Sequence, residues 1–116
     1  MVYNKNIIFA TEVIKQTDMD ALAIQQKLAD YFKTQPVLKA WLFGSFARGE
    51  ETPISDVDIL VTLDHSVPVG IRFFGIYEDL TEILGRKVDL ITDNSLMPFA
   101  QESVNRDKRL IYERPT

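Results

Sequence analysis

The order of apolar and polar segments predicts an α+β fold, a single small domain built on one β-sheet. Short apolar runs of strand length alternate with longer segments whose apolar residues recur every three or four positions, a mixture typical of strands and amphipathic helices. A length of 116 residues is enough for one domain with a buried core. Residues 1–17 show no clear periodicity, and we interpret them as an N-terminal extension of a domain spanning residues 18–116.

The expected elements follow one another as helix, strand, strand, helix, strand, helix and strand. Asp18 stands at an N-cap position before apolar residues at helical spacing, and Pro36 marks the end of this first helix. Gly85 occupies a C-cap position after the second helix. The predicted ranges are helices over about Met19–Lys33, Val69–Leu84 and Phe99–Asn105, and strands over Val37–Phe43, Val57–Leu63, Lys87–Thr92 and Arg109–Tyr112.

The composition restricts the classes of function. The chain has no cysteine, which excludes disulfide scaffolds, thiolate metal sites and cysteine nucleophiles. Its 13 Lys and Arg against 17 Asp and Glu give a net charge of −4, so it lacks the cationic excess of proteins that hold nucleic acid tightly. No apolar run approaches the ~20 residues that span a bilayer, and no secretion signal is recognisable. We expect a cytoplasmic protein with neither a membrane nor a nucleic acid as a tight partner.

Three aspartates are candidates for one metal site. Asp56 and Asp58 lie two positions apart on the predicted strand, so both side chains leave one face, opposite the apolar residues. Asp89 lies on the polar face of another predicted strand and joins them if the two strands are neighbours. Adjacent carboxylates repel unless a cation lies between them, and Mg²⁺ prefers such oxygen ligands. The three residues are candidate ligands of two Mg²⁺ ions, and Asp89 is also the candidate general base.

A glycine-serine pair directly after the Val37–Phe43 strand predicts a phosphate-binding turn. Gly44 lets the backbone approach a ligand without a Cβ in the way, and Ser45 offers a hydroxyl and an N–H at the opening of the next turn. Arg48 adds a positive charge that can pair with phosphate or hold the loop. A phosphate cradle beside a divalent-metal site is what chemistry on a nucleoside triphosphate requires.

Each part taken alone also has a simpler interpretation. Gly44-Ser45 could be only a strand-ending turn, Asp56 and Asp58 the solvent face of an edge strand, and Asp89 a surface residue. Their combination at fixed spacing favours the functional interpretation. A P-loop is rejected, because Glu50-Glu51 stand where Lys and Ser or Thr are needed.

The string GSFARG at residues 44–49, followed after five residues by SDVD at residues 55–58, resembles the motif of the DNA polymerase β nucleotidyltransferase superfamily. It is most similar to that of the minimal nucleotidyltransferases (MNT). The resemblance implies the polymerase β-like fold, a mixed sheet flanked by helices. It also implies nucleotide phosphates on Gly44 and Ser45, to which we add Arg48 and Ser55, and metal ligation by Asp56, Asp58 and Asp89.

MNT proteins are often encoded beside a HEPN-domain ribonuclease and act as its antitoxin, and they can transfer AMP from ATP to a tyrosine of that partner. The resemblance therefore implies an Mg²⁺-dependent adenylyltransferase with ATP as substrate and a HEPN toxin as partner. The sequence leaves the oligomeric state open, with a homo- or a hetero-oligomer as the alternatives to a monomer. The short chain favours a protein acceptor, with the apolar runs Ile7–Phe9 and Ile71–Tyr77 as candidate contacts, and packing in the core is the simpler interpretation of both runs. Two alternatives stay open: an antitoxin that masks its partner without catalysis, and a nucleotidyltransferase for a small molecule such as an aminoglycoside.

Overall fold

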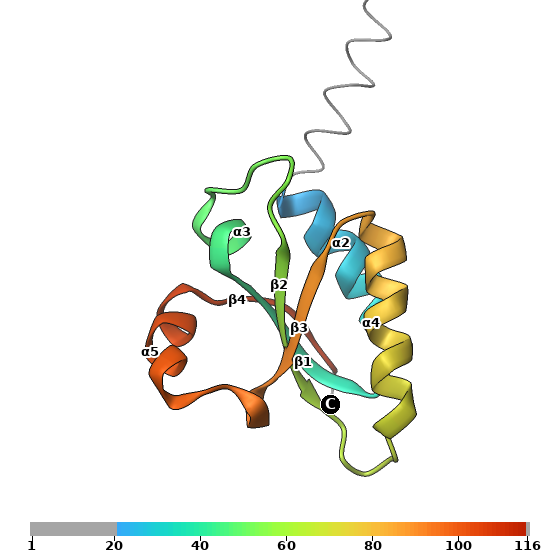
Figure 1. Cartoon of the computed structure of the whole chain (residues 1–116). Helices are drawn as coiled ribbons and strands as arrows, with labels where there is room; N and C mark the ends of the chain where they lie inside the picture. Colours follow the sequence, from blue (N-terminus) through green and yellow to red (C-terminus); the bar gives the residue numbers. More distant parts are fainter. Residues whose placement is uncertain (1–20, 116) are drawn as a thin grey trace, which may run out of the picture.

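The computed structural model describes residues 21–115 of the chain. In chain order the elements are α2 (Ala21–Phe32), β1 (Val37–Phe43), α3 (Gly44–Arg48), β2 (Val57–Leu63), α4 (Gly70–Leu84), β3 (Val88–Thr92), the 3₁₀ turn η1 (Asp93–Ser95), α5 (Pro98–Asp107) and β4 (Arg109–Glu113). Figure 1 shows these elements arranged around one twisted sheet, with α2 and α4 on one side and α5 on the other.

The predicted order of helices and strands is confirmed, and the ranges predicted for the two central strands coincide with β1 and β2. The structure adds α3 and η1, which are too short to leave a periodic apolar pattern. The predicted N-cap Asp18, the start of the first helix at Met19, the apolar run Ile7–Phe9 and the extension over residues 1–17 lie outside the described residues.

The sheet is mixed and has the strand order β3-β2-β1-β4. Strand β1 runs antiparallel to both β2 and β4, whereas β2 and β3 are parallel. A parallel pair needs a crossover connection, which α4 supplies. The register places Asp58 beside Asp89 and Val57 beside Val88. The two strands are therefore neighbours, as the convergence of the aspartates requires, and Asp58 and Asp89 leave the same face of the sheet.

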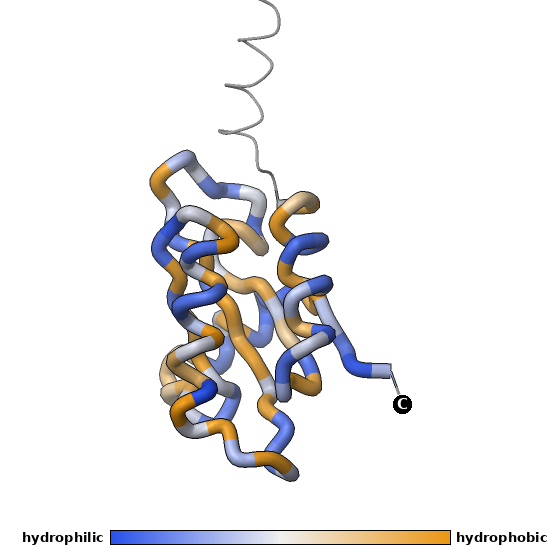
Figure 2. Tube along the Cα trace, turned by 90° about the vertical axis from the view of Figure 1, so that its right-hand side faces the viewer, coloured by the Kyte–Doolittle hydropathy of each residue, from blue (hydrophilic) through white to orange (hydrophobic). Residues whose placement is uncertain are grey.

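The hydrophobic core lies between the sheet and the two helices α2 and α4. Along β2 every second side chain is buried against this layer, as the alternation predicted: Val57, Ile59, Val61 and Leu63. The helices contribute Ile24, Leu28, Phe32, Ile76, Leu80 and Leu84. Figure 2 shows the hydrophobic strand segments running through the middle of the molecule. The polar side chains near the starts of β2 and β3, Asp58 and Asp89, consequently lie on the opposite face of the sheet. Helices α3 and α5 contact each other on that side.

Two hydrogen bonds outside the core determine where α4 ends and how α2 and α4 contact each other. Gly85 follows α4 with φ 62°, and its backbone N–H donates to Thr81 O at 2.9 Å, so the predicted C-cap is confirmed. The Tyr31 hydroxyl of α2 donates to Asp79 of α4 at 2.6 Å. No helix within residues 21–115 is long and apolar enough to cross a membrane.

Replacement of Leu28 by Ala is expected to lower the free energy of unfolding by about 2–5 kcal/mol, because it leaves a cavity between α2 and the sheet. Leu28 is fully buried, whereas Leu22 of the same helix is 72% exposed. The matched change Leu22→Ala should alter stability by less than ~0.5 kcal/mol. Urea unfolding followed by circular dichroism measures both, and equal losses would contradict the assignment of the core face of α2.

Candidate active site

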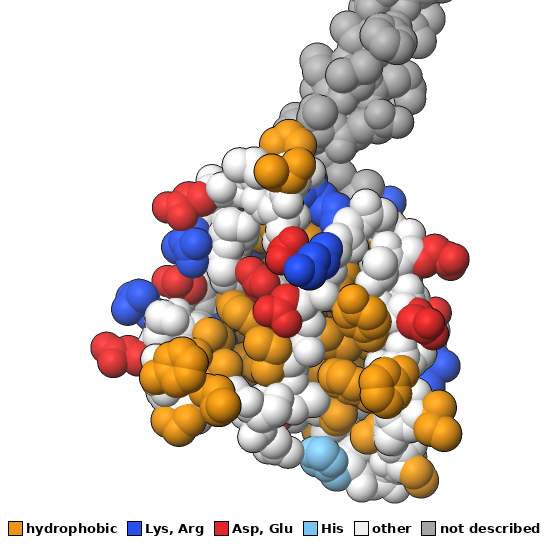
Figure 3. All heavy atoms as spheres, viewed as in Figure 1, with side chains coloured by type: hydrophobic (Ala, Val, Ile, Leu, Met, Phe, Trp, Pro, Cys, Tyr) orange, Lys and Arg blue, Asp and Glu red, His pale blue; other side chains and the backbone are white. Residues whose placement is uncertain are grey.

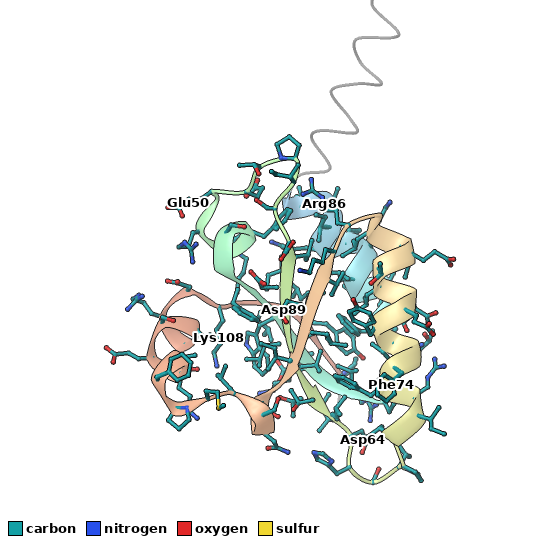
Figure 4. The ribbon with its side chains drawn as sticks, viewed as in Figure 1. Glu50, Asp64, Phe74, Arg86, Asp89 and Lys108 are labelled. Atoms are coloured by element: carbon teal, nitrogen blue, oxygen red, sulfur yellow. The ribbon has the colours of Figure 1, made fainter. Side chains whose placement is uncertain are left out.

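The carboxylates of Asp58 and Asp89 meet where β2 and β3 begin. They occupy paired positions of the parallel strands, and Asp56 stands just before β2. Asp56 thus belongs to the preceding loop and not to the strand, a correction to the predicted placement of both residues on one strand. Figure 4 shows Asp89 at the centre of this face, and Figure 3 shows acidic side chains gathered there between two hydrophobic areas.

The three carboxylates interact electrostatically. The pKa of Asp58 is raised from 3.8 to about 6, first because the half-buried carboxyl loses solvation and then because Asp89 and Asp56 repel its negative charge. Arg48 acts in the opposite direction and lowers this pKa. Ionisation of Asp58 therefore costs free energy in the folded protein.

Gly44 is required by the position of Asp58. Its φ of 69° lies in the left-handed region, which side chains other than glycine rarely adopt. A Cβ on Gly44 would in addition overlap Oδ2 of Asp58. The sequence predicted a glycine that admits a ligand, and the structure shows that it also admits the carboxylate of Asp58. The turn and the acidic group are thus in direct contact.

The short helix α3 starts at Gly44 and presents its N-terminus beside the carboxylates. Phe43, at the N-cap, makes no side-chain hydrogen bond to it. The first N–H groups of a helix have no partner within the helix, so those of α3 can contact an anion. Ser45 is half-buried in this first turn, and its carbonyl accepts the N–H of Glu50 at 2.9 Å. The hydroxyl of Ser45 remains a candidate phosphate contact.

Arg48 and Ser55 are engaged within the protein. The guanidinium of Arg48 contacts Glu50 at 2.9 Å and Asp107 of α5 at 3.3 Å, so it holds α3 against α5. The hydroxyl of Ser55 accepts the backbone N–H of Thr52 at 2.7 Å and closes the turn before Asp56. These contacts support the loop, and a contact of either residue with nucleotide stays a prediction.

Sequence reasoning missed two basic residues directly before β3 that contact Asp56 or the loop leading to it. Lys87 Nζ lies 3.9 Å from Oδ2 of Asp56. Arg86 donates to the carbonyl oxygens of Thr52 and Ser55, in the loop that leads to Asp56. The available signal was the position of the Arg86-Lys87 pair, directly before the strand that carries Asp89.

The donor chemistry of the site suits a hard divalent cation. Three carboxylates that repel one another, one with a raised pKa, form the oxygen-rich environment that Mg²⁺ prefers. As the side chains lie, however, no three His, Cys, Asp or Glu residues between 21 and 115 are grouped to hold a metal ion together. Oδ2 of Asp58 is directed at Gly44, and Asp56 is directed at Lys87. Joint ligation by the three aspartates therefore requires their side chains to turn toward one another.

In this mixed sheet, the paired aspartates at the start of β2 and β3 lie next to the glycine-serine turn that follows β1. This combination defines an enzyme of the nucleotidyltransferase class. Residues 26–116 match the sequence profile described as polymerase beta, nucleotidyltransferase, and the chain belongs to this family. The motif-based recognition of the family and of its fold is thereby confirmed.

Known proteins of this family resemble the chain in sequence and in fold. A protein of Methanocaldococcus jannaschii named as a protein adenylyltransferase is 42% identical over 87 residues, which cover 73% of this chain and 82% of that protein. A solved structure described as a minimal nucleotidyltransferase superposes with a TM-score of 0.66 and 26% identity, covering 79% of this chain and 96% of the other. A solved complex of an AMPylated HEPN toxin of Shewanella oneidensis with an MNT antitoxin contains a chain that superposes with a TM-score of 0.59 at 18% identity, covering 80% of this chain and 72% of the other.

The change Asp58→Asn is expected to raise the free energy of unfolding by about 1 kcal/mol near pH 7.5 in metal-free buffer, a value reduced for partial solvent exposure. An acid whose pKa is higher in the folded protein, here about 6 against 3.8, destabilises that state as the pH rises through this interval. The gain should disappear near pH 4, where the carboxyl is largely protonated in the folded state.

Urea unfolding at the two pH values measures this difference. The control Asp30→Asn alters an exposed aspartate of α2 and should change stability by less than ~0.5 kcal/mol at either pH. An equal gain from Asp58→Asn at both pH values would show that the charge of Asp58 is not its cause.

Proposed function

We propose that this chain is an Mg²⁺-dependent protein adenylyltransferase that transfers AMP from ATP to a hydroxyl, in particular a tyrosine, of a HEPN toxin and so acts as its antitoxin. The observation that carries the proposal is the pairing of Asp58 with Asp89 beside the Gly44-Ser45 turn. The similarity to a protein named as an adenylyltransferase supports the reaction, and the fold shared with the MNT antitoxin supports the partner.

Each residue of the site has a role in this reaction. The N–H groups at the start of α3 and the hydroxyl of Ser45 orient the phosphates of ATP. Asp56, Asp58 and Asp89 would hold Mg²⁺ once their side chains turn toward one another, and the ion would neutralise charge on the triphosphate. The acceptor oxygen attacks the α-phosphorus and pyrophosphate leaves. Asp89, which is exposed, takes the proton of the acceptor hydroxyl.

The partner docks on the first half of α4 (Gly70–Leu84). The apolar run Ile71–Tyr77 divides between two environments: Ile76 is buried in the core, whereas Ile71 is 90% exposed and Phe74 is 70% exposed. Figure 4 shows Phe74 on the lower part of α4. Exposed aromatic and aliphatic side chains that lie together are typical of protein interfaces. The prediction that this run contacts the partner is therefore retained for Ile71 and Phe74 and withdrawn for Ile76.

Incubation of the chain with its partner, Mg²⁺ and α-labelled ATP is expected to label the partner covalently. Asp56→Asn and Asp58→Asn should each reduce the labelling rate roughly 100-fold or more, because each removes a carboxylate from the charged centre. Mass spectrometry of the labelled partner then identifies the modified residue and shows whether it is a tyrosine.

The control for this experiment is Asp30→Asn, which alters an exposed aspartate on α2 and should leave labelling unchanged. Full labelling by both active-site variants would reject the proposed chemistry. Neutralisation of the toxin by variants that no longer label it would instead support the alternative of an antitoxin that acts by contact alone.

The change Phe74→Asp is expected to weaken binding of the partner by about 10-fold or more, since it places a charge in an apolar interface. The matched control Leu22→Asp introduces the same charge at an exposed leucine on α2. Titration calorimetry measures the dissociation constant of each. Equal affinities for Phe74→Asp, Leu22→Asp and the unaltered chain would place the partner elsewhere.

A further inference from the structure

Arg86 joins the two halves of the candidate active site. It follows the Gly85 cap at the end of α4 and precedes β3, and its side chain is half-buried. Its Nη1 donates to the carbonyl oxygen of Thr52 at 3.0 Å and to that of Ser55 at 3.1 Å. Figure 4 shows Arg86 beneath the loop that connects α3 to β2. One charged group thus binds two points of this loop.

The loop over residues 49–56 depends on such contacts, because it forms neither helix nor strand. Its internal hydrogen bonds join Thr52 to Ser55 in both directions: Ser55 N donates to Thr52 O, and Thr52 N donates to Ser55 Oγ. These bonds shape the turn but do not attach it to the rest of the protein. Arg86 makes that attachment to the same turn, and hydrogen bonds from a charged donor are stronger than neutral ones.

Arg86 also contacts the phosphate-binding side of the site. Its guanidinium carbon lies 5.1 Å from the centre of the Phe46 ring, within the range of a cation–π contact. Phe46 is fully buried and belongs to α3, two residues after Gly44. The carbonyl of Ser55 lies one peptide bond before Asp56. Arg86 is therefore in contact with both the helix that starts at Gly44 and the segment that carries Asp56.

We propose that Arg86 is a positioning residue, which holds the loop over residues 49–56 so that Asp56 stays beside Asp58 and close to α3. The backbone continues the same attachment, since Val57 N donates to Lys87 O at 3.0 Å. Misplacement of a reacting or ligating group by ~1 Å can cost about 100-fold in rate. The part of this inference that concerns catalysis rests on the proposed function, whereas the attachment of the loop does not.

The test compares Arg86→Met with Arg86→Lys in the full chain. Methionine keeps an apolar stem against Phe46 but has no N–H donor, whereas lysine keeps donors and charge. In Arg86→Met, amide hydrogen exchange at Val57, whose N–H donates to Lys87 O, should rise about 10-fold, as expected for a loop that detaches more often. The Mg²⁺ concentration for half-maximal labelling should rise and kcat should fall by ~10-fold or more. Arg86→Lys should restore most of both properties.

The matched control is Arg114→Met. Arg114 makes similar contacts at a different end of the sheet, to Asp64 at 2.7 Å and to the carbonyl of Gln35 at 3.3 Å, so its loss tests for a general effect on stability. Arg86→Leu, which likewise has no N–H donor, serves as a second loss variant should Arg86→Met fail to fold.

Unchanged exchange at Val57 in the folded loss variant would overturn the inference. A lysine variant as impaired as the loss variant would overturn it too. If the unaltered chain labels no partner, the proposed function fails, and exchange alone then decides whether Arg86 holds the loop.

Discussion

The location of the site depends on the parallel pairing of β2 with β3, in the register that sets Asp58 beside Asp89. Because side chains alternate along a strand, a shift of one residue would turn Asp89 toward the core and Val88 toward solvent. Burial of Val57 and Val88 under α2 and α4 opposes that shift. The hydrophobic core on one face of the sheet thus determines the arrangement of charges on the other, and α4 is essential to both because it connects the two strands.

Arg48 and Arg86 have different roles around the group of Asp56, Asp58 and Asp89. Arg48 joins α3 to α5 through Asp107 and lowers the pKa of Asp58, whereas Arg86 binds the loop on the other side. Neither forms an ion pair with the three aspartates among the contacts of the described residues. Lys87 Nζ lies 3.9 Å from Asp56 and offsets part of the negative charge. Ligation of a cation would remove the repulsion that remains among the carboxylates.

The strands and longer helices could be predicted because each has a regular apolar pattern and buries one face. The grouping of Asp56, Asp58 and Asp89 could be expected too, since it follows from alternation on neighbouring strands once their pairing is assumed. Contacts made by long polar side chains could not. Whether Arg48 meets phosphate or Glu50, and whether Arg86 reaches Thr52, depends on how loops return in space, which no local pattern encodes. Helix α3 was missed because five residues are too few for a periodicity.

Position 44 needs both a positive φ and the absence of a Cβ, and this has a consequence for suppressor mutations. A substitution there meets both an unfavourable φ and the carboxylate of Asp58. Shortening the side chain at position 58 would relieve the overlap, yet it would remove an acidic group and leave the backbone conformation as demanding as before. No single second-site change can satisfy both demands at once. In a selection for revertants, loss of Gly44 should therefore be regained only by restoration of glycine itself.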